Sequence, residues 1–182
     1  MKYRNLGKTG FKVSEISLGT WQLGGRWGEP FSFEIAEKTV NAALDNGINF
    51  IDTADVYSDG RSEAAVGKIV RNRKERVYIA TKCGRRINPH VMQNFKPEIL
   101  SKFVEDSLKN MGLDTIDLIQ LHCPPTEIYY RPEYFVMFDK LKQSGKILNL
   151  GVSIEKVEEG LKAIEYPNVT TVQIIFNMFR IR

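Results

Sequence analysis

The stretch NFIDTADVY, residues 49–57, is an apolar run that gives way to polar residues, and two later stretches follow the same pattern. VYIATK ends on Lys82, and IDLIQLH ends on His122. Runs of β-branched and apolar residues are typical of parallel strands that are buried on both faces. Asp52, Lys82 and His122 therefore fall where strands give way to loops, and Tyr57 lies one short loop beyond Asp52.

Strand-like and helix-like segments alternate along the rest of the chain. After a short polar hairpin with its turn at residues 7–10, the strand-like runs are ISLGTW, INFID, RVYIATK, IDLIQLH, ILNLGVS and TVQIIF. The helix-like stretches cover residues 32–46, 62–72, 97–111, 132–144 and 154–164. A strand followed by a helix, repeated, predicts right-handed βαβ units and a parallel sheet.

The alternation of strands and helices allows two architectures for such a sheet, a doubly wound sheet and a barrel. The dinucleotide fingerprint of a doubly wound sheet needs the spacing Gly-x-Gly-x-x-Gly after its first strand. Gly24, Gly25 and Gly28 follow the first strand here without that spacing, so the pattern favours an α/β fold of the (β/α)8 barrel type. Side chains at the carboxyl ends of the strands converge on the mouth of such a barrel, where these folds do their chemistry.

The number of strand-like runs falls short of a complete (β/α)8 barrel. The sequence predicts an N-terminal β-hairpin and about the first six βα units, in a single incomplete domain over residues 1–182. We expect part of a larger barrel, with an open edge on the last strand and an exposed apolar face. The alternative is a six-strand version that a partner chain closes.

The composition, with 42% hydrophobic and 26% charged residues in 182, indicates an ordinary soluble globular protein. The formal charge of +4 is spread over many expected helices, which argues against binding to nucleic acid or an anionic membrane. The N-terminus lacks the apolar core of a signal peptide, and no apolar run approaches a membrane span. Cys83 and Cys123 lack metal-type spacing, so we expect reduced thiols, no metal site and a cytoplasmic location. Oligomer formation is left open.

Asp52, Tyr57, Lys82 and His122 form a proton-transfer set if they share one barrel mouth. A lysine ammonium beside a tyrosine favours the phenolate, and a carboxylate beside the lysine keeps it charged and in place. A histidine can donate a hydrogen bond to a carbonyl oxygen and orient it. The set could thus protonate the oxygen of an aldehyde or ketone while hydride arrives at its carbon. None of the four residues carries hydride, so a nicotinamide cofactor is implied.

Here the sequence resembles the aldo-keto reductase superfamily, almost from end to end. The matching stretches, in the family's order, are ISLGTWQLG, GINFIDTADVYSDGRSE, VYIATKCG, MGLDTIDLIQLH, GKILNLGVS and VQIIFN. The combination of Asp-Thr-Ala-x-x-Tyr with a later Thr-Lys and Leu-His is highly specific. The resemblance implies that Tyr57 is the general acid, that Lys82 and Asp52 tune it, and that His122 orients the carbonyl of a small-molecule substrate.

The same resemblance implies a cofactor site for NADPH (NADP). The segment that meets the nicotinamide ribose looks like Gly19, Thr20 and Trp21, with Asp52 also at the cofactor. Positions that bind the carboxamide resemble Ser153 and Gln173.

Two residues depart from the family's pattern near that site. Ile154 stands where an asparagine often follows the serine, and Phe176 stands where a tyrosine is frequent. Because Ile154 cannot hydrogen-bond, fewer side chains would hold the carboxamide. In the family the seventh and eighth strands carry the groups that bind the adenosine and its 2′-phosphate. This sequence has no counterpart of them, so the choice between NADP and NAD stays open.

Rival interpretations remain. One is a catalytically incompetent fragment or regulatory module that keeps the fold, and a weaker one is a phosphate-handling barrel enzyme. Locally, Arg61, Ser62 and Glu63 predict a helix start with Ser62 as its N-cap. Arg85 and Arg86 are interpreted as a solvated basic loop rather than a phosphate site.

Overall fold

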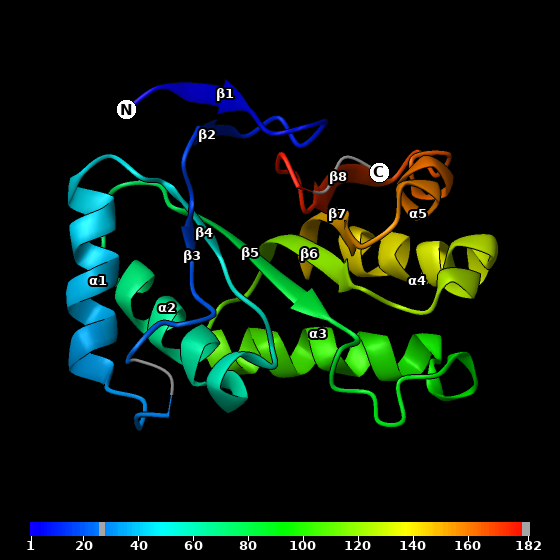
Figure 1. The fold of residues 1–182 in the computed structure, drawn as a ribbon, viewed down its shortest axis with the longest axis horizontal. Coiled ribbons are helices and arrows are strands. Elements are labelled where there is room, and N and C mark those ends of the chain that lie inside the picture. The colour runs from blue at the N-terminus through cyan, green and yellow to red at the C-terminus, as the bar shows by residue number, and fades with distance from the viewer. Residues whose placement is uncertain (26–27, 180–182) are drawn as a thin grey trace.

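Six parallel strands form one sheet in the computed structural model, which describes residues 1–25 and 28–179. The order is β3-β4-β5-β6-β7-β8, so each strand lies beside the one that precedes it in the sequence (Figure 1). The strands are β3 (Leu18–Gly19), β4 (Phe50–Asp52), β5 (Tyr78–Cys83), β6 (Ile116–His122), β7 (Ile147–Ile154) and β8 (Val169–Ile174). The prediction of a partial (β/α)8 fold made of six βα-type strands is confirmed.

One α-helix joins each strand to the next, as βαβ units require. The helices are α1 (Phe33–Asp45), α2 (Arg61–Arg71), α3 (Pro97–Met111), α4 (Pro132–Gln143) and α5 (Val157–Ala163). Helix α3 shows why these segments are helical: a proline fills its first position, and Gly112, with φ +65°, ends it. Its buried residues Leu100, Val104 and Leu108 recur at helical spacing and form one face toward the core.

The predicted N-terminal hairpin is also present, as β1 (Tyr3–Asn5) and β2 (Lys12–Ser14). The backbone N–H of Lys8 donates to Thr170 O at 2.9 Å, and that of Ser14 donates to Asn49 Oδ1 at 2.7 Å. Both acceptors lie at the amino ends of strands. The hairpin therefore sits at the end of the sheet opposite to the one where the strands finish.

Two predicted boundaries on the last βα unit were wrong. Strand β7 runs through Ile154, which pairs with Ile174 and is buried, so the helix expected over 154–164 begins only at Val157. The last strand occupies Val169–Ile174 rather than 171–176. In both places pairing with the neighbouring strand decides the boundary, and a single sequence does not display that register.

The prediction of Ser62 as an N-cap was also wrong. Helix α2 begins one residue earlier, after Gly60, whose φ is +82°. Ser62 lies inside the helix and is fully buried, and its hydroxyl donates to Thr20 Oγ1 at 2.8 Å. The Ser62 hydroxyl therefore bonds to a residue 42 positions away in the sequence, and not to the backbone at the start of its own helix.

Strand β8 has an exposed apolar edge, as expected. Val172 and Ile174 are exposed, and Phe176 just beyond the strand is 91% exposed. Residues 180–182 lie outside the described residues. Within 1–25 and 28–179, no helix is both long and apolar enough to cross a membrane.

Candidate active site

The ammonium of Lys82 lies at the centre of the candidate site. Its side chain is 2% exposed, and its Nζ donates three hydrogen bonds. The acceptors are Asp52 Oδ1 at 2.5 Å, the carbonyl oxygen of Thr53 at 2.8 Å and Tyr57 Oη at 3.3 Å. A lysine ammonium has three protons to donate, so this buried charge is fully hydrogen-bonded. The structure thus brings together three of the four residues of the predicted proton-transfer set.

Local backbone geometry places Tyr57 beside Lys82. Strand β4 ends at Asp52, and Tyr57 opens the short 3-10 helix η1 (Tyr57–Gly60). Ser58 and Asp59 adopt the left-handed conformation, with φ +50° and +54°. This region is strained for residues with a side chain and commonly occurs at functional sites. The phenol of Tyr57, just before this turn, faces the end of β5, where Lys82 Nζ lies 3.3 Å from its Oη.

His122 completes the set at the end of β6. Its ring meets the ring of Tyr57 edge-on, with centroids 6.1 Å apart and planes at 84°. Burial, followed by the positive charges of Lys82 and Arg85, lowers the pKa of His122 to about 3. The imidazole is therefore neutral near pH 7 and can donate one hydrogen bond without carrying charge.

The tautomer of His122 follows from its burial. Nδ1 is buried and has no hydrogen-bond partner in the described part of the chain. An unpaired buried N–H is the rarer and more costly case, so we assign the proton to Nε2. This tautomer makes Nε2–H the donor available to a ligand.

Two glutamines hold Asp52 from the other side, and the sequence interpretation missed one of them. Gln120 Nε2 donates to Asp52 Oδ2 at 3.3 Å, and Gln173 Nε2 donates to the same oxygen at 3.2 Å. Gln120 lies two positions before His122 in IDLIQLH, so both side chains project from the same face of β6. An uncharged polar residue within an otherwise apolar strand was the signal that could have identified it.

The residues predicted to hold a cofactor fall into two groups at the strand ends. Ser153 pairs in register with His122 on one side and with Gln173 on the other. Gly19 pairs in register with Asp52, and a Cβ added at Gly19 would meet nothing within 4 Å. The structure therefore places Ser153 and Gln173 on the adjacent strands β7 and β8, and Gly19 on β3 at the other edge of the sheet, all in register with residues of the carboxyl ends.

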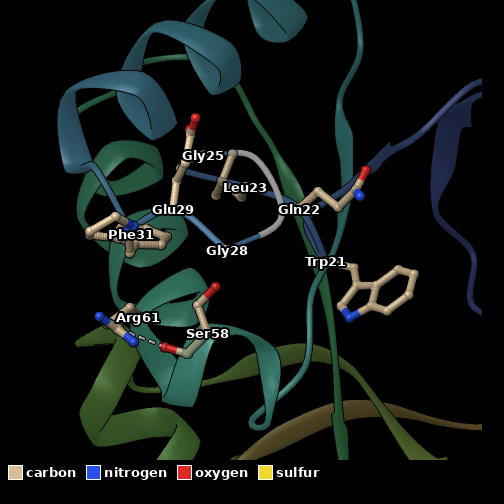
Figure 2. A pocket seen from close by; sticks show the side chains of 11 residues that line it. Trp21, Gln22, Leu23, Gly25, Gly28, Glu29, Phe31, Ser58 and Arg61 are labelled. Carbon is tan, nitrogen blue, oxygen red and sulfur yellow. Dashed lines mark hydrogen bonds between the residues drawn. The ribbon is translucent and has the colours of Figure 1, made fainter.

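Thr20 and Trp21 have different surroundings. Thr20 is fully buried, and its hydroxyl donates to the carbonyl oxygen of Asp52 at 3.0 Å, so this side chain supports the strand end. Trp21 is 60% exposed and lines a cavity of about 260 Å³ (Figure 2). In Figure 2 Trp21 lies on one side of this cavity and Phe31 and Arg61 on the other.

The two departures from the family's pattern also differ in the structure. Ile154 is buried, so its side chain packs in the core. Phe176 projects into solvent. Neither side chain can hydrogen-bond to an amide.

Asp55, between Asp52 and Tyr57 in the sequence, is a buried carboxyl. Neither carboxylate oxygen has a hydrogen bond to another described residue. Burial, then the negative charge of Glu63, raises the pKa of Asp55 from 3.8 to about 7. In the sequence Asp55 is indistinguishable from an ordinary turn aspartate, so its burial could not be anticipated.

The Asp55→Asn variant is expected to gain more stability at high pH than at low pH. Between about pH 4 and pH 7 the folded protein keeps a proton on Asp55 that the unfolded chain has lost, so the free energy of unfolding falls as the pH rises. Asparagine has no carboxyl to titrate, so the free energy of unfolding of the variant does not fall in this way. The gain should be about 3 kcal/mol larger at about pH 8 than at about pH 5, measured by urea unfolding.

His122 acts with the opposite sign, so the comparison needs a control. Its lowered pKa contributes stability above 6.5 that is lost as the pH falls toward 3. Both proteins share this contribution, and the difference between variant and wild type cancels it. Asp114→Asn, at an exposed position, provides the matched control. An Asp55→Asn effect that is the same at both pH values would show that Asp55 is ionised throughout.

A family model and several known proteins match this chain. The model of the Aldo/keto reductase family matches residues 15–182. The aldo-keto reductase YhdN of Bacillus subtilis is 36% identical, over 98% of this chain and 55% of its own length. The NADH-specific methylglyoxal reductase of Escherichia coli is 29% identical, over 98% of this chain and 60% of its own.

Solved structures show the same similarity. The glycerol dehydrogenase AKR11B4 from Gluconobacter oxydans matches with a TM-score of 0.80 and 35% identity, over 98% of this chain and 56% of that one. An aldo-keto reductase from Klebsiella pneumoniae, in complex with NADPH, matches with a TM-score of 0.75 and 25% identity, over 97% and 59%. The chain thus spans little more than half the length of these relatives.

Proposed function

The chain belongs to the aldo/keto reductase family, and from this premise we propose that its barrel mouth serves the NADPH-dependent reduction of an aldehyde or ketone to an alcohol. The observation that carries the proposal is the Lys82 ammonium, which donates to both Asp52 Oδ1 and Tyr57 Oη. With His122 edge-on to Tyr57, one mouth holds a proton donor, a cation that stabilises its conjugate base and a neutral hydrogen-bond donor.

Each residue has a distinct part in the proposed reaction. His122 Nε2–H donates to the carbonyl oxygen of the substrate and polarises it. Tyr57 passes its proton to that oxygen, and Lys82 stabilises the phenolate that remains. Asp52, which Gln120 also contacts, keeps the ammonium beside the phenol. A bound nicotinamide supplies the hydride that this set lacks.

The strand ends beside the set fit a nicotinamide. Ser153 and Gln173 are paired in register, and a hydroxyl beside an amide can match the donor and acceptor of a carboxamide. The space beside Gly19 is open, so a flat ring can approach the backbone there. Because Gln173 also contacts Asp52, the proposed cofactor side and the proton-transfer side share a residue.

Fluorescence titration of the protein with NADPH and with NADH tests this proposal. We expect saturable binding of NADPH, weaker binding of NADH, and oxidation of bound NADPH when a small aldehyde is added. Tighter binding of NADH would correct the choice of cofactor and leave the chemistry standing. Binding of neither cofactor would contradict the proposal and favour a non-catalytic module that keeps the family's fold.

The remaining parts of the proposed function follow from composition and family. We propose a small-molecule carbonyl substrate and a cytoplasmic location, without nucleic acid or membrane as a partner. The spread of the +4 formal charge over the chain supports the last point.

A further inference from the structure

Gln120 is a buried amide in the middle of the sheet, in contact with the carboxylate of the proton-transfer set. The residue is 3% exposed, and its Nε2 donates to Asp52 Oδ2 at 3.3 Å. The other oxygen, Asp52 Oδ1, accepts from Lys82 Nζ at 2.5 Å. An ionised carboxylate only accepts hydrogen bonds, so the amide nitrogen of Gln120, and not its oxygen, faces Asp52. The two oxygens of this carboxylate are therefore held by two different donors.

The strand register explains how Gln120 reaches a residue two strands away. Gln120 is paired in register with Lys82 on β5, so the two side chains stand next to each other on one face of the sheet. Asp52 on β4 is paired with Ala80, two positions before Lys82, and residues two apart on a strand share a face. The residue of β5 that is level with Asp52 is thus an alanine, whose methyl group leaves the longer Gln120 side chain free to approach.

On its other side Gln120 lies against bare backbone. It is paired in register with Gly151 on β7. A Cβ added at Gly151 would lie 2.1 Å from Thr171 Oγ1 and 3.3 Å from Gln120 Cγ. A glycine at this position therefore leaves the Gln120 side chain the space that it occupies and little more. Close packing of this kind restricts a side chain to one arrangement.

Gln173 donates to the same oxygen but is held differently. Its Nε2 lies 3.2 Å from Asp52 Oδ2, yet the residue is exposed and belongs to β8, which ends the strand order of the sheet. Gln120 is buried and has a neighbouring strand on each side. If Gln173 turns to a carboxamide, as the proposed function has it, Gln120 is the amide that stays on Asp52 Oδ2.

We propose that Gln120 is a positioning residue for the proton transfer: it fixes the Asp52 carboxylate and, through it, the ammonium of Lys82. The inference rests on the proposed function. A donor on Oδ2 keeps Oδ1 directed at Lys82 Nζ, which lies 3.3 Å from Tyr57 Oη. Without this donor the carboxylate can turn and draw the ammonium away from the phenol. The bonds that change are the same in either case: hydride from the reduced nicotinamide adds to the carbonyl carbon, and the proton of Tyr57 goes to the oxygen.

The Gln120→Met variant tests the proposal, because methionine keeps the length of the side chain and lacks the amide donor. We expect kcat for a small aldehyde to fall about 10-fold, the size of one hydrogen bond to a charged group, with KM almost unchanged. The solvent deuterium isotope effect on kcat should rise, since proton transfer becomes a slower step.

Asn149→Leu is the matched control. Asn149 is another buried amide, on β7, and its Nδ2 donates to the carbonyl oxygen of Asp117 at 3.4 Å, away from Asp52. The variant should lower the free energy of unfolding and leave kcat and the isotope effect unchanged. A fall of kcat as large as that of Gln120→Met would show a general loosening of the sheet and would overturn the inference.

A double-mutant cycle with Asp52→Asn shows whether Gln120 acts through Asp52. In the Asp52→Asn background, Gln120→Met should have no further effect on kcat, because the carboxylate that it orients is absent. Urea unfolding should show the same coupling without turnover: the loss of stability in the double variant should be smaller than the sum of the two single losses.

Other results would overturn the inference in distinguishable ways. Absence of aldehyde reduction by the wild type would remove the proposed function, and the inference with it. Reduction by the wild type and by Gln120→Met at equal rates would remove the inference alone. Losses of kcat of equal size in the wild-type and Asp52→Asn backgrounds would show that Gln120 acts independently of Asp52.

Discussion

The Tyr57→Phe variant is expected to lose about 10²- to 10⁴-fold in kcat for carbonyl reduction, while its affinity for NADPH stays close to that of the wild type. The phenol is the group placed to protonate the carbonyl oxygen, since its Oη accepts from the Lys82 ammonium. Phenylalanine keeps the ring and its edge-on contact with His122, so the loss should reflect the missing proton alone.

Steady-state kinetics and a fluorescence titration on the same preparation check this expectation. Tyr130→Phe is the matched control, because Tyr130 is an exposed tyrosine whose ring lies against the Lys162 ammonium of α5. Its kcat should equal that of the wild type. Near wild-type turnover by Tyr57→Phe would assign the proton to another donor, and a parallel loss of NADPH binding would point to damage of the mouth.

The Lys82→Met variant is expected to lose both activity and stability. The side chain of Lys82 is 2% exposed and that of its partner Asp52 is 13% exposed, so the pair is nearly buried. Removing one member of a buried ion pair leaves the other charge uncompensated and typically costs about 3–5 kcal/mol. Urea unfolding should show a loss of this size, and kcat should fall because no cation stabilises the phenolate.

A double variant separates the two losses. Lys82→Met combined with Asp52→Asn removes both charges, so it should recover part of the free energy of unfolding that Lys82→Met lost. It should recover no activity. Wild-type stability of the single variant would mean that the ion pair is more hydrated than its burial indicates. Recovered activity in the double variant would mean that Lys82 is dispensable.

The sheet and the four-residue set were predictable because their signals are local. Strands that are buried on both faces appear as continuous apolar runs, and the polar residue that ends each run marks the mouth. Asp52, Lys82 and His122 each end such a run, so parallel topology alone brings them to one end of the sheet. Tyr57 needs only a short turn to reach them.

Other parts of the site depend on contacts between distant segments. Gln120 reaches Asp52 across the intervening strand β5, and that contact exists only in the observed register. Ser62 has the identity of a helix cap but bonds to Thr20 instead. Neither contact can be recognised from the spacing of residue types in the sequence.

Arg85 and Arg86 illustrate the same limit on the surface. A basic dipeptide after a strand predicts a solvated loop, and composition cannot show which of the two arginines forms an ion pair. The position of Asp106 on α3 decides it in favour of Arg86. Which of the two arginines forms an ion pair with α3 is therefore a property of the tertiary structure.

Transfer of deuterium from the reduced cofactor to a product alcohol tests carbonyl reduction by this mouth most directly. The protein is incubated with NADPH deuterated on the transferable position and with a small aldehyde, and the product is analysed by mass spectrometry. We expect one deuterium on the carbinol carbon for each cofactor oxidised, and almost no labelled alcohol from Tyr57→Phe in the same time. Bound NADPH without labelled alcohol, or equal labelling by both proteins, would contradict the proposed chemistry.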